Sequence, residues 1–505
     1  MNLMMLLEMA SSGFGERLAV TSAGRSLSYA ELFRASHRAK QTIQNAGVER
    51  VAMLDVSSLA VPIALFGSAW SGRPFAPLNY RLTADEVARL ADQIAPALLI
   101  TDAERAPDLA ELDGIQVVVR DEWIDAAASG PETEIEPDWP MDPEDIAILL
   151  FTSGTTGAPK GAVLRHKHIV SYILGSVEFM GAAEEDAALM SVPPYHIAGM
   201  AAIASSVYAG RRIVQLPNFS AGEWLSLARE EKITNAFVVP TMLQRIIAEL
   251  EETLAPGETG DLGSVRALSY GGGKMPLPVI EKAMALFPTT DFTNAYGLTE
   301  TSSTISVLTP DDHREAAASD DAAGRRRLVS VGRPLPTLEV QICDEDGKAV
   351  AVGERGEIYV RGEQVSGEYL GRGSLLSDDG WFATRDGGSL DEEGYLFVEG
   401  RIDDVIVRGG ENLSPGEIED VLLDHEAVAD AAVVGIPDEQ WGEGVAAAIV
   451  LTTGATASAE VLQKWVKDHL RSSRVPQRIE FRDELPYNET GKLLRRQVRA
   501  ELSGG

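Results

Sequence analysis

Short apolar segments alternate with longer amphipathic stretches over most of the chain, from Leu18 to about Val360. The apolar segments at 50–56, 97–101, 146–151 and 235–240 have the length of buried strands, and the stretches between them carry apolar residues at helical spacing. Strands that alternate with helices in this way are typical of βαβ units, whose parallel sheets are covered by helices. The pattern predicts an α/β fold with stacked, mostly parallel sheets.

The pattern changes near residue 400. Short alternating segments between turn residues from 356 to 398 predict a β-rich subdomain, and helical spacing begins at Ser414. Strand-like segments and a further helix at 459–470 follow, enough for a small α+β domain. A chain of 505 residues also exceeds the size at which one hydrophobic core keeps growing. We therefore expect a large N-terminal domain and a small C-terminal domain, with the boundary at 400–404.

The N-terminus and the segment at 314–327 are each predicted to form one short structural element. The apolar N-terminus carries Glu8 and lacks the basic start of a signal peptide, so its spacing predicts a short amphipathic helix. Residues 314–327 are charged and of low complexity, which predicts a surface loop. No apolar run is long enough to cross a bilayer, and a cytoplasmic protein is expected.

Composition narrows the classes of function. The formal net charge of −33 repels nucleic acids and anionic membrane surfaces, which argues against either as the main partner. A single cysteine, Cys343, excludes an intramolecular disulfide and a cysteine-rich zinc site. With 45% hydrophobic and 24% charged residues, the chain has the proportions of a globular protein rather than a disordered one.

One loop has the composition of a phosphate-binding site. Residues 152–161 read TSGTTGAPKG directly after an apolar strand, and their glycines and hydroxyls allow backbone N–H groups and side chains to surround a phosphate. The loop is not a Walker A motif, because a proline precedes Lys160 and no Ser or Thr follows it. On composition alone, a flexible surface loop remains an equal alternative.

The full string closely resembles the signature of the adenylate-forming superfamily, which comprises acyl-CoA and aryl-CoA synthetases, peptide-synthetase adenylation domains and beetle luciferases. Further motifs that resemble the family follow in the same order, and with an opening segment at 27–32 they cover nearly the whole chain. They are NAYGLTET at 294–301, GWFATRD at 380–386, GRIDDVIVRGGENLSPGEIE at 400–419 and PYNETGKL at 486–493.

The resemblance implies an ATP-dependent carboxylic acid–CoA ligase, most like an acyl-CoA or aryl-CoA synthetase. Such an enzyme forms an acyl-adenylate and pyrophosphate, and then acyl-CoA and AMP. Its partners are a small carboxylic acid, ATP, Mg²⁺ and coenzyme A. In this chain the resemblance implies that Glu300 holds the metal, that His196, Glu300, Thr155 and Lys492 take part in catalysis, and that the phosphates of ATP lie against Thr152, Ser153, Gly154, Thr155, Thr156, Gly157 and Lys160.

The nucleoside part of ATP has its own candidates. A tight glycine turn after the strand at 267–270 would let a flat base approach the backbone, and the resemblance implies that this turn and the first downstream motif enclose adenine. It further implies that Asp386 and Arg401 contact the ribose, since two carboxylate oxygens suit a vicinal diol. Within the turn and this motif, Gly271, Gly272, Gly273 and Tyr296 are the candidates for adenine, and Asn294, Ala295, Gly297 and Thr299 are further ATP- or AMP-binding candidates.

The chain departs from the family pattern beside this aspartate. The family commonly has Thr-Gly-Asp, whereas this chain has Thr384, Arg385 and Asp386. If the glycine normally adopts a positive φ, then Arg385 is strained or the turn has a different shape.

The resemblance also implies a mobile C-terminal domain. The expected parts are an N-terminal adenylation domain at 1–400, a hinge at 401–404 centred on Asp403, and a lid domain at 405–505. In one pose Lys492 would approach the acid and the α-phosphate. In the other, the segment with Arg408, Gly409 and Gly410 would admit a narrow pantetheine arm.

Candidates for the coenzyme A nucleotide and for the acid follow from residue chemistry. Trp441 can stack on adenine and Arg474 can pair with a phosphate, although such a tryptophan is also often a domain cap. The segment PPYHIAG at 193–199 resembles the part of the family that flanks the acyl group. An acyl chain needs an apolar slot, and the candidates for its walls, which are equally compatible with a core position, are His196, Ile197, Phe237, Val238 and Thr241.

Several alternatives stay open at this stage. An adenylation enzyme that loads a carrier-protein phosphopantetheine differs only in what delivers the thiol. A luciferase-like oxygenase uses the same adenylation step. An inactive nucleotide- or acyl-binding regulator is the third alternative, and Lys492, Glu300 and the complete loop argue against it. The sequence does not distinguish a fatty, aromatic, alicyclic or steroid-derived acid, and it leaves homo-oligomer formation open.

Overall fold

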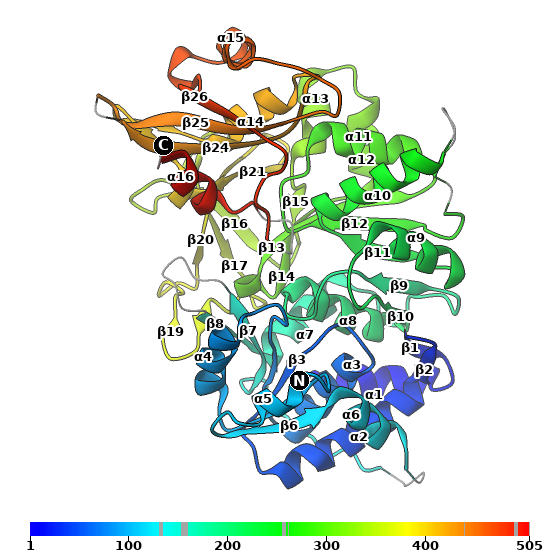
Figure 1. The fold of residues 1–505 in the computed structure, drawn as a ribbon. Coiled ribbons are helices and arrows are strands. Elements are labelled where there is room, and N and C mark those ends of the chain that lie inside the picture. The colour runs from blue at the N-terminus through cyan, green and yellow to red at the C-terminus, as the bar shows by residue number, and fades with distance from the viewer. Residues whose placement is uncertain are drawn as a thin grey trace.

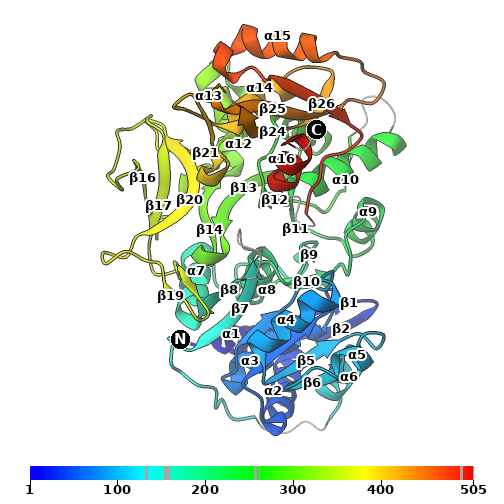
Figure 2. The same ribbon diagram turned by 60° about the vertical axis from the view of Figure 1, so that its left-hand side comes forward.

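The computed structural model describes residues 1–130, 135–152, 160–254, 259–260, 262–438, 440–488 and 493–503. The described chain is an α/β fold with two large, mostly parallel sheets, a four-stranded antiparallel sheet and a C-terminal sheet (Figures 1 and 2). The predicted fold class is confirmed. Among the described residues, no helix has both the length and the apolar character that a bilayer span requires.

The first large sheet, sheet A, contains nine strands in the order β15-β14-β13-β12-β11-β9-β10-β1-β2. Its central strands from β13 to β1 are parallel, while β14, β15 and β2 are antiparallel additions at the two edges. The strands are β1 (Leu18–Ser22), β2 (Arg25–Ser28), β9 (Ala187–Met190), β10 (Arg212–Gln215), β11 (Asn235–Val238), β12 (Ala267–Gly271), β13 (Asp291–Leu298), β14 (Ser303–Leu308) and β15 (Arg333–Pro334).

The second large sheet, sheet B, has eight strands in the order β19-β18-β8-β7-β4-β3-β5-β6. Strands β7, β4, β3, β5 and β6 are parallel, and β8, β18 and β19 extend the sheet in antiparallel fashion. The strands are β3 (Arg50–Leu54), β4 (Phe75–Pro77), β5 (Ala97–Thr101), β6 (Ile115–Val119), β7 (Ile146–Thr152), β8 (Lys160–Arg165), β18 (Glu368–Tyr369) and β19 (Gly373–Ser374).

Helices fill the space between sheets A and B and form one core with both (Figure 1). Two of them, α3 and α8, are apolar on nearly every side, as expected for helices buried between two sheets. The predicted N-terminal helix is present and contributes Met4, Leu6 and Leu7 to this core. The helices are α1 (Met4–Phe14), α2 (Tyr29–Ala46), α3 (Ala60–Ser71), α6 (Arg120–Ala128), α7 (His166–Ser176) and α8 (Ile197–Ala209).

Further helices cover the outer faces of the two sheets. The outer face of sheet A packs on α9, α10 and α11, and that of sheet B packs on α4. The segment predicted as a loop at 314–327 is mostly helical, because Thr309 caps α12 and exchanges hydrogen bonds with Asp312 at its first turn. The helices are α4 (Ala84–Ile94), α5 (Ala106–Leu109), α9 (Ala221–Glu230), α10 (Pro240–Thr253), α11 (Leu277–Leu286), α12 (Pro310–Ala318) and α13 (Ala322–Arg326), with short 3₁₀ turns η1 (Thr299–Thr301) and η2 (Arg327–Val329).

The last two sheets are smaller. Sheet C is antiparallel and leads directly into the C-terminal sheet D, which packs α14 and α15 on one side and α16 on the other (Figure 2). The elements are β16 (Glu339–Cys343), β17 (Gly356–Arg361), β20 (Phe382–Leu390) and β21 (Leu396–Arg401) in sheet C; β22 (Ile406–Arg408), β23 (Glu411–Leu413), β24 (Val428–Asp438), β25 (Gly442–Leu451) and β26 (Arg478–Arg482) in sheet D; and η3 (Ile402–Asp404), α14 (Pro415–Leu423), α15 (Ala459–His469), η4 (Ser472–Arg474) and α16 (Arg495–Ser503).

Polar contacts connect the segment beyond Arg401 to the rest of the chain. Lys274, which follows β12, pairs with Asp420 on α14 at 2.5 Å. The Ser414 hydroxyl donates to the carbonyl oxygen of Glu399 at 3.2 Å. The two side chains of this ion pair are 38% and 52% exposed, so we expect it to add only modest stability.

Candidate functional site

The carboxyl ends of β12 and β13 meet at a glycine-rich turn. A Cβ atom at Gly271 would lie 2.1 Å from the carbonyl oxygen of Ala295, so the close approach of the two strands already requires glycine there. Gly272 has a φ of +80°, and a Cβ atom there would contact only Val239, at an ordinary van der Waals distance of 3.5 Å. Gly272, unlike Gly271, leaves room for a flat ligand.

A hydrogen-bonded cluster lies where β13 approaches sheet C. The Tyr296 hydroxyl donates to Asp386 Oδ2 at 2.7 Å, and Arg401 Nη1 donates to Asp386 Oδ1 at 3.0 Å. Burial and the neighbouring Asp386 carboxylate raise the pKa of Tyr296 well above its usual value, so the phenol remains a donor. The predicted ribose contacts, Asp386 and Arg401, are therefore brought together with the predicted adenine neighbour Tyr296.

Glu300 lies in η1, immediately after β13. Its side chain accepts a hydrogen bond from the Tyr369 hydroxyl, and its carbonyl oxygen accepts from the N–H groups of Ser366 and Gly367 at 2.8 and 3.2 Å. Tyr369, on β18, belongs to none of the sequence motifs, and no local pattern distinguishes it from other tyrosines. Its proximity to Glu300 arises only when sheet B meets η1.

Other motif residues lie on β7, β8 and β13. Thr152 ends β7 and Lys160 begins β8, and the two are paired across the strands. Asn294 donates to the carbonyl oxygen of Ser330 at 3.1 Å and is buried. Ser153, Gly154, Thr155, Thr156, Gly157 and Lys492 lie outside the described residues.

Arg385 has the backbone conformation that the sequence departure suggested. Its φ is +64°, in the region that favours glycine. Its N–H donates to Glu357 Oε1 at 2.9 Å, and its guanidinium pairs with Asp403 at 2.7 Å. The residue that replaces the glycine thus contacts the predicted hinge residue.

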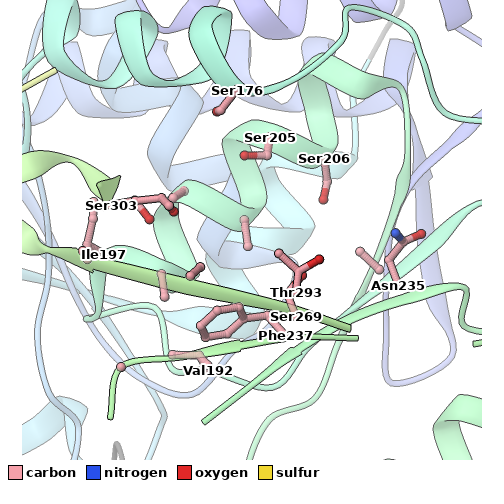
Figure 3. Close-up of a pocket in the computed structure, with 18 of the residues that line it drawn as sticks. Ser176, Val192, Ile197, Ser205, Ser206, Asn235, Phe237, Ser269, Thr293 and Ser303 are labelled. Carbon is pink, nitrogen blue, oxygen red and sulfur yellow. The ribbon is translucent and has the colours of Figure 1, made fainter. Parts of the chain in front are cut away.

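A cavity of about 660 Å³ lies between sheet A and α8 (Figure 3). Ile197, Ala201 and Ser205 line it from one face of α8, at helical spacing. Toward one end it reaches Gly272, Gly297 and Thr299, beside the glycine-rich turn, and toward the other end it reaches the start of β11. Figure 3 shows Ile197 and Ser303 near the first end, and Ser206, Thr293 and Asn235 near the second.

The predicted acid-pocket residues are divided among three environments. His196, Ile197 and Phe237 line the cavity. Val238 instead packs into the core on the opposite face of sheet A, because successive strand residues point to opposite faces. Thr241 lies in another hollow, which Pro193, Tyr487 and Asn488 also line.

His196 precedes α8 and is an uncharged wall of the cavity. Burial lowers the pKa of its imidazole to about 4, which leaves the ring neutral at physiological pH. Its Nε2 atom is buried and has no hydrogen-bond partner in the described part of the chain. A neutral ring with one unsatisfied nitrogen can hydrogen-bond a ligand that enters the cavity, but it supplies no positive charge.

The coenzyme A candidates form a group on sheet D. Gly409 and Gly410 have φ values of +58° and +83°, and the Gly409 N–H donates to the carbonyl oxygen of Trp441 at 2.8 Å. The Arg408 guanidinium lies 5.9 Å from the Trp441 ring centroid. Arg474 is 13% exposed and pairs with Glu411 and Glu417 at 2.8 and 2.7 Å, so its charge is already neutralised within the protein.

Two protein-family models match most of the chain. The AMP-binding enzyme family model matches residues 7–370, and the AMP-binding enzyme C-terminal domain model matches residues 417–492. The chain belongs to the AMP-binding enzyme family.

Two relatives of this AMP-binding enzyme are named as ligases. It is 34% identical to a fatty acid–[acyl-carrier-protein] ligase of Streptomyces coeruleorubidus, over 96% of this chain and 93% of that protein. It is also 34% identical to the 2-succinylbenzoate–CoA ligase of Geobacillus kaustophilus, over 96% of this chain and 95% of that one. The solved o-succinylbenzoate CoA synthetase of Bacillus subtilis, in complex with its acyl-adenylate, matches with a TM-score of 0.83 and 31% identity over 98% and 97% of the two chains. The expectation of an AMP-forming acid–thiol ligase is confirmed.

The residues at the site fit a magnesium nucleotide. Mg²⁺ usually keeps its waters and binds through one or two carboxylates together with substrate phosphates. Glu300 supplies such a carboxylate beside Tyr369, and the described residues contain no cluster of three or more metal-ligating side chains that would form an all-protein site. The donor set of this AMP-binding enzyme therefore suits a metal that arrives with ATP.

Proposed function

We propose that this enzyme is an ATP-dependent carboxylic acid–CoA ligase. In the first step, a carboxylate oxygen attacks the α-phosphate of ATP and pyrophosphate leaves. In the second, the thiol of coenzyme A attacks the acyl carbon and AMP leaves. The observation that carries the proposal is a cavity that opens beside the nucleotide candidates, at Gly272, Gly297 and Thr299.

The nucleotide would be held from several sides. Gly272 and Tyr296 would flank adenine, and Asp386 and Arg401 would contact the ribose, with the loop from Thr152 to Lys160 at the phosphates. A bound Mg²⁺ would neutralise phosphate charge, with Glu300 as its protein ligand. The paired state of Tyr296, Asp386 and Arg401 supports these roles, because a prearranged donor–acceptor set needs little reorganisation when a ligand binds.

The position of the C-terminal segment suits the adenylation step. Tyr487 and Asn488, which directly precede the segment with Lys492, line the same hollow as Pro193 and Thr241. Pro193 lies three residues before His196, and His196 lines the cavity between sheet A and α8. We propose that Lys492 reaches the reacting carboxylate and α-phosphate from this side, and that rotation about Asp403 then exchanges it for the Arg408–Gly410 segment. The parts in this scheme are 1–400, a hinge at 401–404 and a lid at 405–505.

A second acceptor has equal support from the relatives. The acyl-carrier-protein ligase and the succinylbenzoate–CoA ligase are each 34% identical to this chain. A carrier-protein phosphopantetheine presents the same thiol as coenzyme A, so the cavity and the nucleotide candidates serve both. Trp441, 43% exposed beside the Gly409–Gly410 turn, favours free coenzyme A, because an exposed indole offers a stacking surface for its adenine.

Release of AMP and pyrophosphate tests the proposal. The enzyme is incubated with MgATP and acids of graded length and ring content, without an acceptor, with coenzyme A, or with a phosphopantetheinylated carrier protein. Turnover that depends on coenzyme A supports the ligase. Turnover only with the carrier protein selects the second acceptor. Hydrolysis of ATP to ADP and phosphate, with no AMP, contradicts both.

A further inference from the structure

The cavity between sheet A and α8, where the acid is proposed to bind, is here called the acid cavity. At its inner end, near the start of β11, it contains an arginine. Helix α8 ends at Gly210, whose φ of +75° turns the chain, and Arg211 follows immediately before β10 begins. Arg211 lines the cavity together with Ser206 and Asn235, which begins β11. Polar residues at this end contrast with the apolar side chains of Ile197 and Phe237 along the walls (Figure 3).

The backbone of Arg211 is fixed on both sides. Its N–H donates to the carbonyl oxygen of Ser206 at 2.8 Å, as part of the turn that ends α8. Its carbonyl oxygen accepts a hydrogen bond from the Tyr29 hydroxyl at 2.8 Å, and the same hydroxyl contacts the Ser206 carbonyl oxygen at 3.2 Å. Tyr29 is fully buried, so the position of Arg211 is determined by the core rather than by a mobile loop.

The guanidinium, in contrast, has no partner among the described residues. Its Nε atom is buried without a hydrogen bond, and it forms no ion pair there. Asp186, the nearby carboxylate that could neutralise it, pairs with Arg266 and accepts the N–H of Ala183 at 2.9 Å. A largely buried charge without a partner is unfavourable, and a ligand that supplies the opposite charge removes that penalty.

Burial also makes the charged form of the Arg211 guanidinium less favourable. It lowers the pKa of the guanidinium from its usual value, against the opposing effects of Asp186 and Tyr29. Arginine nevertheless stays protonated in proteins, so the cavity end is cationic. The Asn235 side chain adds an uncharged amide that can donate a hydrogen bond beside it.

The two ends of the cavity lie far enough apart to bind two ends of one acid. Ala267 and Gly272 both line the cavity and are separated by the length of β12, roughly 16 Å at the rise of an extended strand. The reacting carboxylate belongs at the Gly272 end, beside the nucleotide candidates. An acid that fills the cavity brings its far end to Arg211.

We propose that Arg211 binds a second carboxylate at the far end of the substrate, and that the enzyme prefers dicarboxylic acids with an apolar middle. The inference rests on the proposed ligase function and names its substrate class. A guanidinium binds a carboxylate through two parallel hydrogen bonds, which makes Arg211 a specificity-determining residue. A monocarboxylic acid of equal length would leave the buried charge unpaired.

The test uses matched pairs of acids. Mono- and dicarboxylic acids of equal length, across a graded series with linear and aromatic middles, are compared by pyrophosphate release. For the wild-type enzyme we expect kcat/KM at the best length to favour the dicarboxylic acid by on the order of 10²-fold, because a site built for a polar group rejects the analogue that lacks it. The preference should lie mainly in KM, since Arg211 is remote from the reacting atoms.

Two variants and a control isolate the residue. Arg211→Met should remove most of the preference and raise kcat/KM for the monocarboxylic acid, a gain that misfolding cannot produce. Arg211→Lys should keep part of the preference, because a lysine retains the charge but not the two-pronged geometry. Arg212→Met is the matched control: Arg212 is the next residue, pairs with Glu231 at 2.7 Å, and should leave the preference unchanged.

The possible outcomes distinguish failure of the dicarboxylate preference from failure of the proposed ligase function. Adenylation of acids with no dicarboxylate preference at any length overturns the inference and leaves the ligase intact. An equal effect of Arg211→Met and Arg212→Met also overturns it. The absence of AMP formation with every acid overturns the ligase assignment and the inference together.

Discussion

The nucleotide candidates beside the acid cavity and the arginine at its inner end differ in how far their polar groups are already paired. At the nucleotide end, Asp386 holds Tyr296 at 2.7 Å and Arg401 at 3.0 Å, and Glu300 accepts from Tyr369. At the inner end, Arg211 has no ion-pair partner among the described residues. Groups that are already paired hold their geometry before a ligand binds. A buried charge without a partner instead gains the most favourable interaction energy when a ligand of opposite charge binds. On the proposed function, the groups that serve every acid would be prearranged, and the choice of acid would depend on one unpaired group.

The largest effect is expected from Lys492, at the nucleotide end. Lys492→Ala should lower the rate of adenylation by at least on the order of 10²-fold, because it removes a positive charge from the developing charge at the α-phosphate. Pyrophosphate release measures this step. Thioester formation from a supplied acyl-adenylate should be much less affected. Near-normal adenylation by the variant would contradict the role of Lys492.

Asp386→Asn weakens the prearranged cluster itself. It removes the charge that pairs with Arg401 and is expected to raise KM for ATP by about 10-fold, with a smaller change in KM for the acid. Steady-state kinetics with each substrate varied in turn give both constants. Asp346→Asn, at an exposed turn, serves as the control. Equal increases in both KM values would show a general loss of structure instead.

The neutral imidazole of His196 predicts a dependence of stability on pH. Burial lowers its pKa from 6.5 to about 4, so the unfolded chain binds more protons between those values. The contribution of His196 to the free energy of unfolding is fully present above pH 6.5. It decreases as the pH falls, by about 2 kcal/mol at pH 5. Urea unfolding at pH 7.5 and 5 should show a smaller loss for His196→Asn than for wild type, with exposed His469→Asn as the control. Identical losses in wild type and His196→Asn would exclude a neutral buried His196.

The smallest effect concerns Arg385, between the nucleotide end and the predicted hinge. Arg385→Ala removes the exposed pair with Asp403, whereas Arg385→Gly removes both the pair and the strain of a positive φ. The glycine variant should therefore be more stable than the alanine variant by about 1 kcal/mol in urea unfolding. The pair itself contributes less than about 1 kcal/mol. An alanine variant as stable as the glycine variant would show that the turn changes shape.

Much of the fold could be predicted from the chain. The buried segments at 97–101 and 146–151 form β5 and β7, because length and apolar character alone identify strands inside a parallel sheet. The segment at 314–327 was predicted wrongly, since its composition favours a loop but the Thr309 cap and Pro310 start a helix. The positive φ at Arg385 could be predicted because a specific glycine was missing from a known pattern.

The site was predictable where motifs carry it, and not elsewhere. Tyr296, Asp386 and Arg401 come from separate motifs and meet in the structure. Arg211 lies in no motif, and its exposure to the cavity depends on how α8 ends and on which face of sheet A the cavity lies. Val238 shows the same limit, because a shift of one residue along β11 decides between cavity and core. Such choices depend on tertiary packing rather than on local pattern.

Single-turnover detection of the acyl-adenylate is a direct test of the two-step ligase reaction. Enzyme in excess is mixed with MgATP and a dicarboxylic acid without an acceptor, quenched, and analysed by mass spectrometry; coenzyme A is then added to a parallel sample. We expect acyl-AMP and pyrophosphate to form first, and coenzyme A to convert the adenylate to acyl-CoA and AMP. Formation of ADP and an acyl phosphate, with no adenylate, would contradict this two-step reaction.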